Sequence, residues 1–153
     1  MTKHIWHYTV GKHLPAIRES KVIKLSTSNV PASERAAAWF SSNSIWENTC
    51  NKVWENRNGR IIQLSKEETH KLGGGLFRIG VLPDAAPYNW EDFKRLSGIS
   101  RGGISHMEMF QRKVGARNNQ WYCSFDEVPS DYWLDIQIWN AKGKTWETFG
   151  QAE

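Results

Sequence analysis

The chain has 153 residues, of which 39% are hydrophobic and 24% are charged. This length and composition are typical of a folded domain with a substantial core and exclude a disordered chain. The net charge of +4 permits an anionic partner, such as nucleic acid or a phosphate-bearing cofactor. The basic residues are scattered rather than clustered, so charge alone does not select the partner. We expect one domain over residues 1–153.

Several functional classes lack their signature in this sequence. No run of about 18 apolar residues is present, and the start does not resemble a signal peptide, so we expect no membrane association and a cytoplasmic location. The two cysteines, Cys50 and Cys123, are too few for a disulfide framework. The five histidines match no zinc spacing, so we expect no metal. Gly73-Gly74-Gly75 lacks the Lys-Ser/Thr of a phosphate loop.

In chain order, the first third predicts short strands and helices separated by polar turns. Pro15 sits where proline favours a helix start, and Asn58-Gly59 is a turn signal. We expect strands over 5–10, 22–25, 36–41 and 60–64, and helices over 14–20 and 45–54. The segment 26–34 is expected to be a loop.

Capping patterns mark the helices of the middle third. Ser65 and Glu68 match a capping box, and Asn89 is a further candidate cap. A second capping box is expected at Ser105 and Glu108, after a glycine-rich loop over 100–103. These patterns predict a short helix that starts at the Ser65 capping box and stops at Gly73-Gly74-Gly75, and helices over 90–96 and 106–114, with a strand over 76–82 between the first two.

The last third predicts strands over 121–125, 133–138 and 145–149, with a turn at 141–143. The strands and helices interleave without the regular alternation that builds a parallel sheet. We therefore predict an α+β fold with a split, mostly antiparallel sheet and short flanking helices.

The first strand carries the leading candidate site residues. His7 and Thr9 are two positions apart, so a strand places both side chains on the same face. Nine tryptophans accompany them, and such rings either fill cores or line pockets for planar ligands. Arg78 stands alone on an apolar strand and is either an edge residue or an anion contact.

Ile5-Trp6-His7-Tyr8-Thr9, the helix after it, and Trp39-Phe40-Ser41 resemble, in this order, the NAD-using ADP-ribosyltransferase superfamily. The superfamily includes diphtheria-toxin-like toxins, DNA-modifying toxins and RNA 2′-phosphotransferases. The resemblance implies a split antiparallel sheet of the ADP-ribosyltransferase-like type, with a nicotinamide-ribose cleft between its halves and NAD as cofactor.

The resemblance also implies roles for particular residues. His7 matches a histidine that hydrogen-bonds the adenosine-side ribose of NAD, and Thr9 matches a small hydroxyl residue two positions further on. Trp46 is the nearest candidate for a ring that stacks on nicotinamide. The residues expected to bind the cofactor are His7, Tyr8, Thr9, Trp39, Phe40, Ser41 and Trp46.

The catalytic acid of such enzymes opens a late strand, and here Gln120 occupies the matching position. A neutral amide can position a hydroxyl group but cannot offset a developing positive charge. Either Glu108 or Glu127 supplies the acid, or the chemistry is altered.

Three functions follow from the resemblance. The first is an ADP-ribosyltransferase that modifies a host protein or a nucleic acid, as a bacterial toxin or phage effector would. The second is an RNA 2′-phosphotransferase-like enzyme, for which the available phosphate-binding candidates are Arg78, Arg101, Arg112 and Arg117. The third is a catalytically degenerate fold that binds a nucleotide or a protein.

Overall fold

The computed structural model describes residues 4–150, which form an α+β fold around one large antiparallel sheet. The strands are β1 (Ile5–Val10), β2 (Val22–Ile23), β3 (Ala38–Ser41), β4 (Val53–Glu55), β5 (Ile61–Gln63), β6 (Leu76–Val81), β7 (Tyr88–Asn89), β8 (Trp121–Ser124), β9 (Val128–Pro129), β10 (Trp133–Asn140) and β11 (Thr145–Gly150). The α-helices are α1 (Leu14–Ser20), α2 (Lys66–Gly73), α3 (Trp90–Leu96) and α4 (Arg101–Val114). The predicted α+β class and mostly antiparallel sheet are confirmed.

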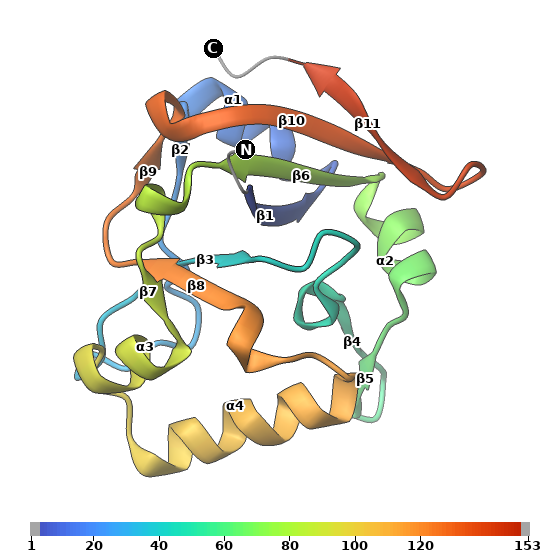
Figure 1. Cartoon of the computed structure of the whole chain (residues 1–153). Helices are drawn as coiled ribbons and strands as arrows, with labels where there is room; N and C mark the ends of the chain where they lie inside the picture. The colour runs from blue at the N-terminus through green and yellow to red at the C-terminus, as the bar shows by residue number, and fades with distance from the viewer. Residues whose placement is uncertain (1–3, 151–153) are drawn as a thin grey trace.

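The large sheet has the order β11-β10-β6-β1-β3-β8-β7, and it opens where β1 meets β3. β1 pairs with β6 through six residues but with β3 only through Trp6 and Ser41. Strands β11, β10, β6 and β1 therefore form one half, and β3, β8 and β7 form the other (Figure 1). Strands joined by a single pair leave room between them for side chains and for a cavity.

The central strands follow from their sequence patterns. All six residues of β6 are buried, as expected of a strand between two others and covered on both faces. In β1, Trp6, Tyr8 and Val10 are buried together in one core cluster, whereas Ile5 belongs to another. His7 and Thr9 share the face of Ile5 because strand side chains alternate. The predicted placement of these two side chains on one face is confirmed.

Two predicted caps are present. Ser65 and Glu68 form a capping box at α2, and Asn89 and Asp92 form another at α3. In each, the cap side chain accepts from a backbone N–H and the acid reaches back, satisfying two donors that a helix leaves open.

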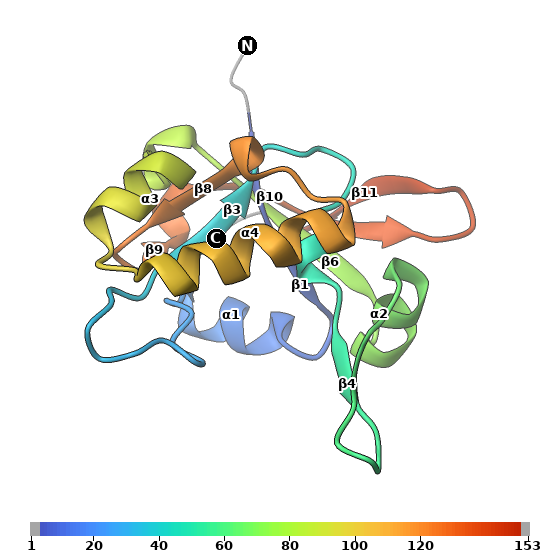
Figure 2. The ribbon, with the colours of Figure 1, turned by 90° about the horizontal axis from the view of Figure 1, so that it is seen from below.

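The predicted helix over 45–54 is wrong. This segment contains only the 3-10 helix η1 (Asn48–Cys50), followed by β4. The Asn43 side chain accepts from the N–H groups of Ile45 and Trp46, as an N-cap does, but no α-helix follows this turn. Val53 and Trp54 then favour strand geometry and pair with β5. The β4–β5 hairpin projects from the body of the molecule (Figure 2).

The predicted start of the next helix at Ser105 is also wrong. α4 begins at Arg101, five residues before the expected start, because the hydroxyl of Ser100 accepts from the N–H of Gly103 at 3.0 Å and caps the helix. The glycine-rich segment 100–103 is thus a cap and first turn rather than a loop. The helix end at Val114, with Gly115 in a left-handed conformation after it, is confirmed.

Three buried clusters make up the core, and aromatic rings dominate two of them. One cluster packs α3 and α4 on β8 through rings such as Trp90, Phe93 and Trp121. Another packs Trp6 and Tyr8 against Trp46 beside β10 and β11. Among residues 4–150, no helix has the length and apolar character needed to cross a bilayer.

Candidate functional site

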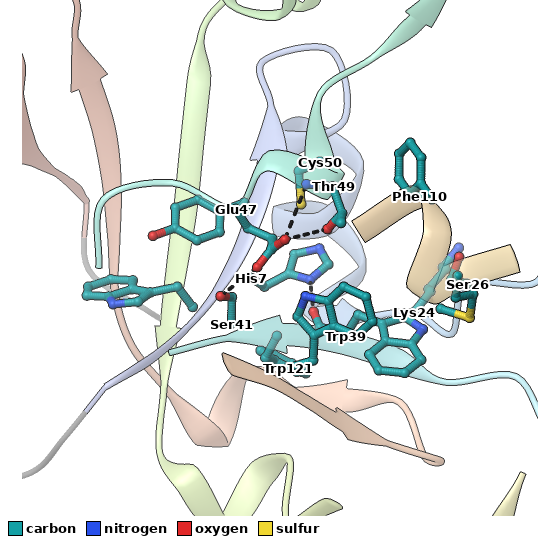
Figure 3. Close-up of a pocket in the computed structure, with 14 residues that line it drawn as sticks. His7, Lys24, Ser26, Trp39, Ser41, Glu47, Thr49, Cys50, Phe110 and Trp121 are labelled. Carbon is teal, nitrogen blue, oxygen red and sulfur yellow. Dashed lines mark hydrogen bonds between the residues drawn. The ribbon is translucent and has the colours of Figure 1, made fainter. Parts of the chain in front are cut away.

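A cavity of about 380 Å³ lies at the opening between the two halves of the sheet. This volume is in the range that holds small organic ligands. Its walls come from β1, β3, the turn after β3, the start of β8 and one side of α4 (Figure 3). The residues that line it are Trp6, His7, Tyr8, Lys24, Ser26, Trp39, Phe40, Ser41, Glu47, Thr49, Cys50, Met107, Phe110 and Trp121. The structure thus brings together five of the seven predicted cofactor-binding residues.

His7 connects the two halves of the sheet. Its Nδ1 lies 3.0 Å from the carbonyl oxygen of Trp39, and since a carbonyl only accepts, Nδ1 carries the proton and donates it. Burial lowers the pKa of His7, against a smaller opposing effect of that hydrogen bond. At neutral pH the ring is therefore neutral, with Nε2 as an acceptor. A neutral imidazole beside a cavity suits a ligand hydroxyl group.

Ser41 and Glu47 form a buried hydrogen-bonded pair at the cavity wall. The Ser41 hydroxyl donates to Oε1 of Glu47 at 2.9 Å and accepts from the N–H of Asn43. Oε2 of Glu47 accepts from the hydroxyl of Thr49 at 2.7 Å and from its N–H at 3.2 Å. Because the single hydroxyl proton of Ser41 goes to Glu47, this serine positions the carboxylate and does not donate to a ligand.

Sequence reasoning missed Glu47. In the helix that was expected over 45–54, no pattern distinguishes Glu47 from an acid on the exposed face. The polar residues around Glu47 were the signal that could have indicated a turn. Asn43 and Thr49 flank Glu47, and such residues favour turns that reverse the chain. A turn after β3 returns Glu47 to the end of that strand, beside Ser41.

Aromatic side chains form the walls on both sides of the cavity. Trp39 and Trp121 come from neighbouring strands, with ring centroids 6.4 Å apart, and Phe110 approaches from α4. The indole N–H of Trp121 is buried and has no hydrogen-bond partner among residues 4–150. Buried donors are normally paired, so a ligand acceptor at this wall would complete the hydrogen bonding.

The rim of the cavity is polar and positively charged. Lys24 and Ser26 follow β2, are exposed and contribute to the lining. Lys24 is the only basic residue besides His7 among the described lining residues. An ammonium group at the entrance to an aromatic pocket suits an anionic group on the ligand, such as a phosphate.

Cys50 lines the cavity but is not suited to act as a nucleophile. Burial, and to a lesser degree the nearby Glu47 carboxylate, raises the pKa of the Cys50 thiol to about 12. The thiolate is the reactive form, so a thiol with this pKa stays protonated and unreactive at neutral pH.

Two of the predicted cofactor-binding residues lie away from the cavity lining. Trp46 is buried against Tyr8, with ring centroids 5.0 Å apart, and its indole N–H donates to Asn51 Oδ1 at 2.8 Å. It belongs to the core cluster of Trp6 and Tyr8. Thr9 is partly buried further along β1, beyond the cavity.

The three candidates for the catalytic acid position also lie outside the lining. Gln120 precedes β8, and its Oε1 accepts from Asn43 Nδ2 at 3.4 Å. Glu108 accepts from the indole N–H of Trp90 at 2.9 Å and joins α4 to α3. Glu127 is exposed in the turn between β8 and β9. Gln120 contacts the turn that leads from Ser41 to Glu47, and both of these residues line the cavity.

Arg78 is not an edge residue, as one interpretation of the sequence had it. β6 lies between β10 and β1, and the Arg78 side chain is buried among aromatic rings. Its guanidinium lies 3.6 Å from the ring centre of Trp6 and 4.5 Å from that of Trp146. It donates to Gln137 Oε1 at 2.8 Å, to the Tyr8 hydroxyl at 3.3 Å and to the Ser44 carbonyl.

The Tyr8 hydroxyl in turn donates to the carbonyl of Asn43. Burial raises the pKa of Tyr8 to about 12, although Arg78 opposes the shift, so the phenol stays neutral. Arg78 and Tyr8 together fix the turn after β3 to the neighbouring half of the sheet. The other predicted phosphate-binding arginines, at 101, 112 and 117, do not line the cavity either.

Among residues 4–150, no group of three or more His, Cys, Asp or Glu side chains is arranged to hold a metal ion. Comparison with known proteins provides no identification: no family model, no curated protein and no solved structure matches the chain.

Proposed function

We propose that this protein is an NAD-dependent ADP-ribosyltransferase of the ADP-ribosyltransferase-like fold. The observation that carries the proposal is the cavity at the opening of the sheet, where His7 from β1 and Ser41 from β3 meet. They are two of the seven residues for which the sequence resemblance implies contacts with NAD, and five of the seven line this one pocket.

The chemical character of each wall supports the same ligand. The neutral His7 ring offers an acceptor for a ribose hydroxyl group, and the Trp39 and Trp121 rings suit a planar nicotinamide. Lys24 at the rim suits the pyrophosphate. In this proposal the pocket binds NAD, releases nicotinamide and passes ADP-ribose to a protein or nucleic-acid acceptor, in the manner of a toxin or phage effector.

The RNA 2′-phosphotransferase alternative gains no support from the arginines, because none of the four lines the cavity. The degenerate, binding-only alternative differs from the proposal in one measurable respect. It retains NAD binding but releases no nicotinamide.

The test is nicotinamide release from NAD by the purified protein, together with NAD binding by calorimetry. The wild type is expected to bind and cleave NAD, and His7→Ala is expected to lose both because the ribose contact is removed. His13→Ala is the matched control, since His13 is exposed before α1 and makes no side-chain cap. A wild type that binds NAD without cleaving it supports the binding-only alternative, and one that does neither overturns the proposal.

A further inference from the structure

We propose that Glu47 supplies the carboxylate that stabilises the ribosyl cation during NAD cleavage, in place of an acid on the late strand β8. This inference rests on the proposed function and adds a catalytic residue to it. It assigns the acid to the turn after β3, an element for which the sequence resemblance implies no acid.

Glu47 is the only carboxylate among the described residues that line the cavity. Glu47 is only 5% exposed, so its carboxylate is largely shielded from bulk water. No Lys, Arg or His of residues 4–150 forms an ion pair with it. Burying a carboxylate without a cation is costly, and buried charges in folded proteins are normally paired. A cation formed in the adjoining cavity would be its partner.

The carboxylate is held in one orientation before any ligand enters. Ser41 fixes Oε1 to β3, and Thr49 fixes Oε2 through its hydroxyl and its N–H. Asn48, the next residue, donates from Nδ2 to the carbonyl of Val114 at 2.9 Å and fixes the turn to the end of α4. A charge held in place by such contacts needs no reorganisation during the reaction, which is how enzymes make electrostatic stabilisation effective.

Oxygens of Glu47 still have capacity for a further interaction. A carboxylate offers about four lone-pair sites, and the side chain accepts three hydrogen bonds within the protein. Figure 3 shows Glu47 with Ser41 on one side and Thr49 on the other, above the His7 ring. His7 and Glu47 both line this cavity, and we assign to Glu47 the charge that develops on the nicotinamide-side ribose.

The reaction moves positive charge in the direction that a carboxylate favours. The bond between ribose C1′ and the pyridinium nitrogen breaks, and its electron pair goes to that nitrogen, which leaves in neutral nicotinamide. The positive charge passes to C1′ and the ring oxygen of the ribose. Water or an acceptor nucleophile then bonds to C1′ and releases a proton. A negative group nearer the ribose than the nicotinamide ring stabilises the transition state more than bound NAD, and so it raises kcat.

The late strand offers no competing group in this position. Gln120 is neutral and contacts Asn43, while Glu108 and Glu127 lie on other surfaces. The structure therefore explains how a chain with glutamine at that strand could keep the reaction: the acid comes from six residues after Ser41 rather than from β8.

The experiment compares Glu47→Gln, Glu47→Asp and Gln120→Ala with the wild type, measuring kcat for nicotinamide release, Kd for NAD and the midpoint of thermal unfolding. Glu67→Gln is the matched control because Glu67 is an exposed acid of α2. Glu47→Gln is expected to lower kcat by about 100-fold, the scale of losing one electrostatic contact to a transition state. The Kd for NAD should stay within roughly threefold, because the contact is stronger in the transition state.

Glu47→Asp keeps the charge in a displaced position, so it should retain more activity than Glu47→Gln, and it also serves as the test if the glutamine variant does not fold. Folded Glu47 variants that cleave NAD at the wild-type rate overturn the inference. So does a loss of kcat that is matched by an equal loss of NAD affinity, as a merely structural role predicts. A large loss of kcat in Gln120→Ala alone would assign the position to β8 and leave the proposed function standing. Absence of NAD cleavage by the wild type would instead overturn the proposed function, and this inference with it.

Discussion

The Nδ1–H group of His7 donates to the carbonyl oxygen of Trp39 across the opening of the sheet, at a distance of 3.0 Å. β1 and β3 share only one backbone pair, so a side chain supplies a connection that the strands themselves do not make. The same hydrogen bond fixes the tautomer of His7 and leaves Nε2 as an acceptor. One contact thus contributes both to joining the two halves and to the chemistry of the cavity.

This arrangement predicts a loss of stability at mildly acidic pH. The pKa of His7 is lowered by burial from an ordinary value of about 6.5. At pH values between the folded and unfolded pKa, the unfolded chain binds more protons than the folded chain. The contribution of His7 to stability is therefore complete above pH 6.5. That contribution declines as the pH falls below 6.5 and through the folded pKa. His7→Gln, which cannot titrate, should show a weaker fall of the unfolding midpoint between pH 7.5 and pH 5.5. An equal fall in both proteins would contradict the prediction.

Lys24 is expected to contribute to NAD affinity through the phosphates. Lys24→Gln should raise the Kd for NAD by up to about fivefold, the range for an exposed charge pair. The same change should leave the Kd for nicotinamide riboside, which has no phosphate, unaltered. Lys142→Gln, in the turn between β10 and β11, is the matched control. A similar change in affinity for both ligands would show that Lys24 does not act on the phosphates.

Replacing Trp46 distinguishes a role in core packing from a role in stacking on the ligand. Because its ring is 4% exposed and packs on Tyr8, Trp46→Ala should lower the free energy of unfolding by about 3–5 kcal/mol. The variant should bind NAD with nearly wild-type affinity at temperatures where it is folded, as measured by calorimetry. A selective loss of NAD affinity without a loss of stability would restore the stacking role that the sequence predicted.

Much of the secondary structure could be predicted, because hydrophobic periodicity and helix caps are local signals. The capping box at Ser65 and the apolar run of β6 are patterns within one element. Two errors came from competing local signals. Val53 and Trp54 favoured a strand over the end of the helix expected at 45–54, and Ser100 offered a cap before the one that was expected at Ser105.

The site was partly predictable for the same reason. His7 alternates with apolar residues within β1, and Ser41 ends the apolar strand β3, so local sequence patterns mark both. Glu47 depends on a reversal of the chain and on contacts with Ser41 and Thr49, which no periodicity reveals. The environment of Arg78 depends on Trp6 and Trp146, which are far apart in the sequence and adjacent only after folding.

Arg78 is expected to be important for stability. Replacing it by methionine removes two ring contacts and leaves Tyr8 and Gln137 without a donor, which should cost about 2–4 kcal/mol. Lysine should not restore this stability, because it lacks the planar group that stacks and donates in several directions. Arg60→Gln, on the exposed hairpin, should change the free energy of unfolding by less than about 0.5 kcal/mol. Denaturant unfolding of the three variants tests the order, and equal stability of Arg78→Lys and wild type would contradict it.

Two glycines are expected to respond to alanine in opposite directions. A β-carbon at Gly11 would lie 2.0 Å from the carbonyl oxygen of Gly74, so the backbone between β1 and α2 would have to move. Gly102 lies in the first turn of α4, and its β-carbon would meet only the Ser100 hydroxyl oxygen, at 3.9 Å. Gly102→Ala should therefore stabilise the protein by about 0.4–1 kcal/mol through helix propensity and reduced freedom of the unfolded chain. Gly11→Ala should destabilise it by at least about 1–3 kcal/mol. Thermal unfolding checks both, and a Gly11→Ala protein as stable as wild type would show that the contact with Gly74 is not rigid.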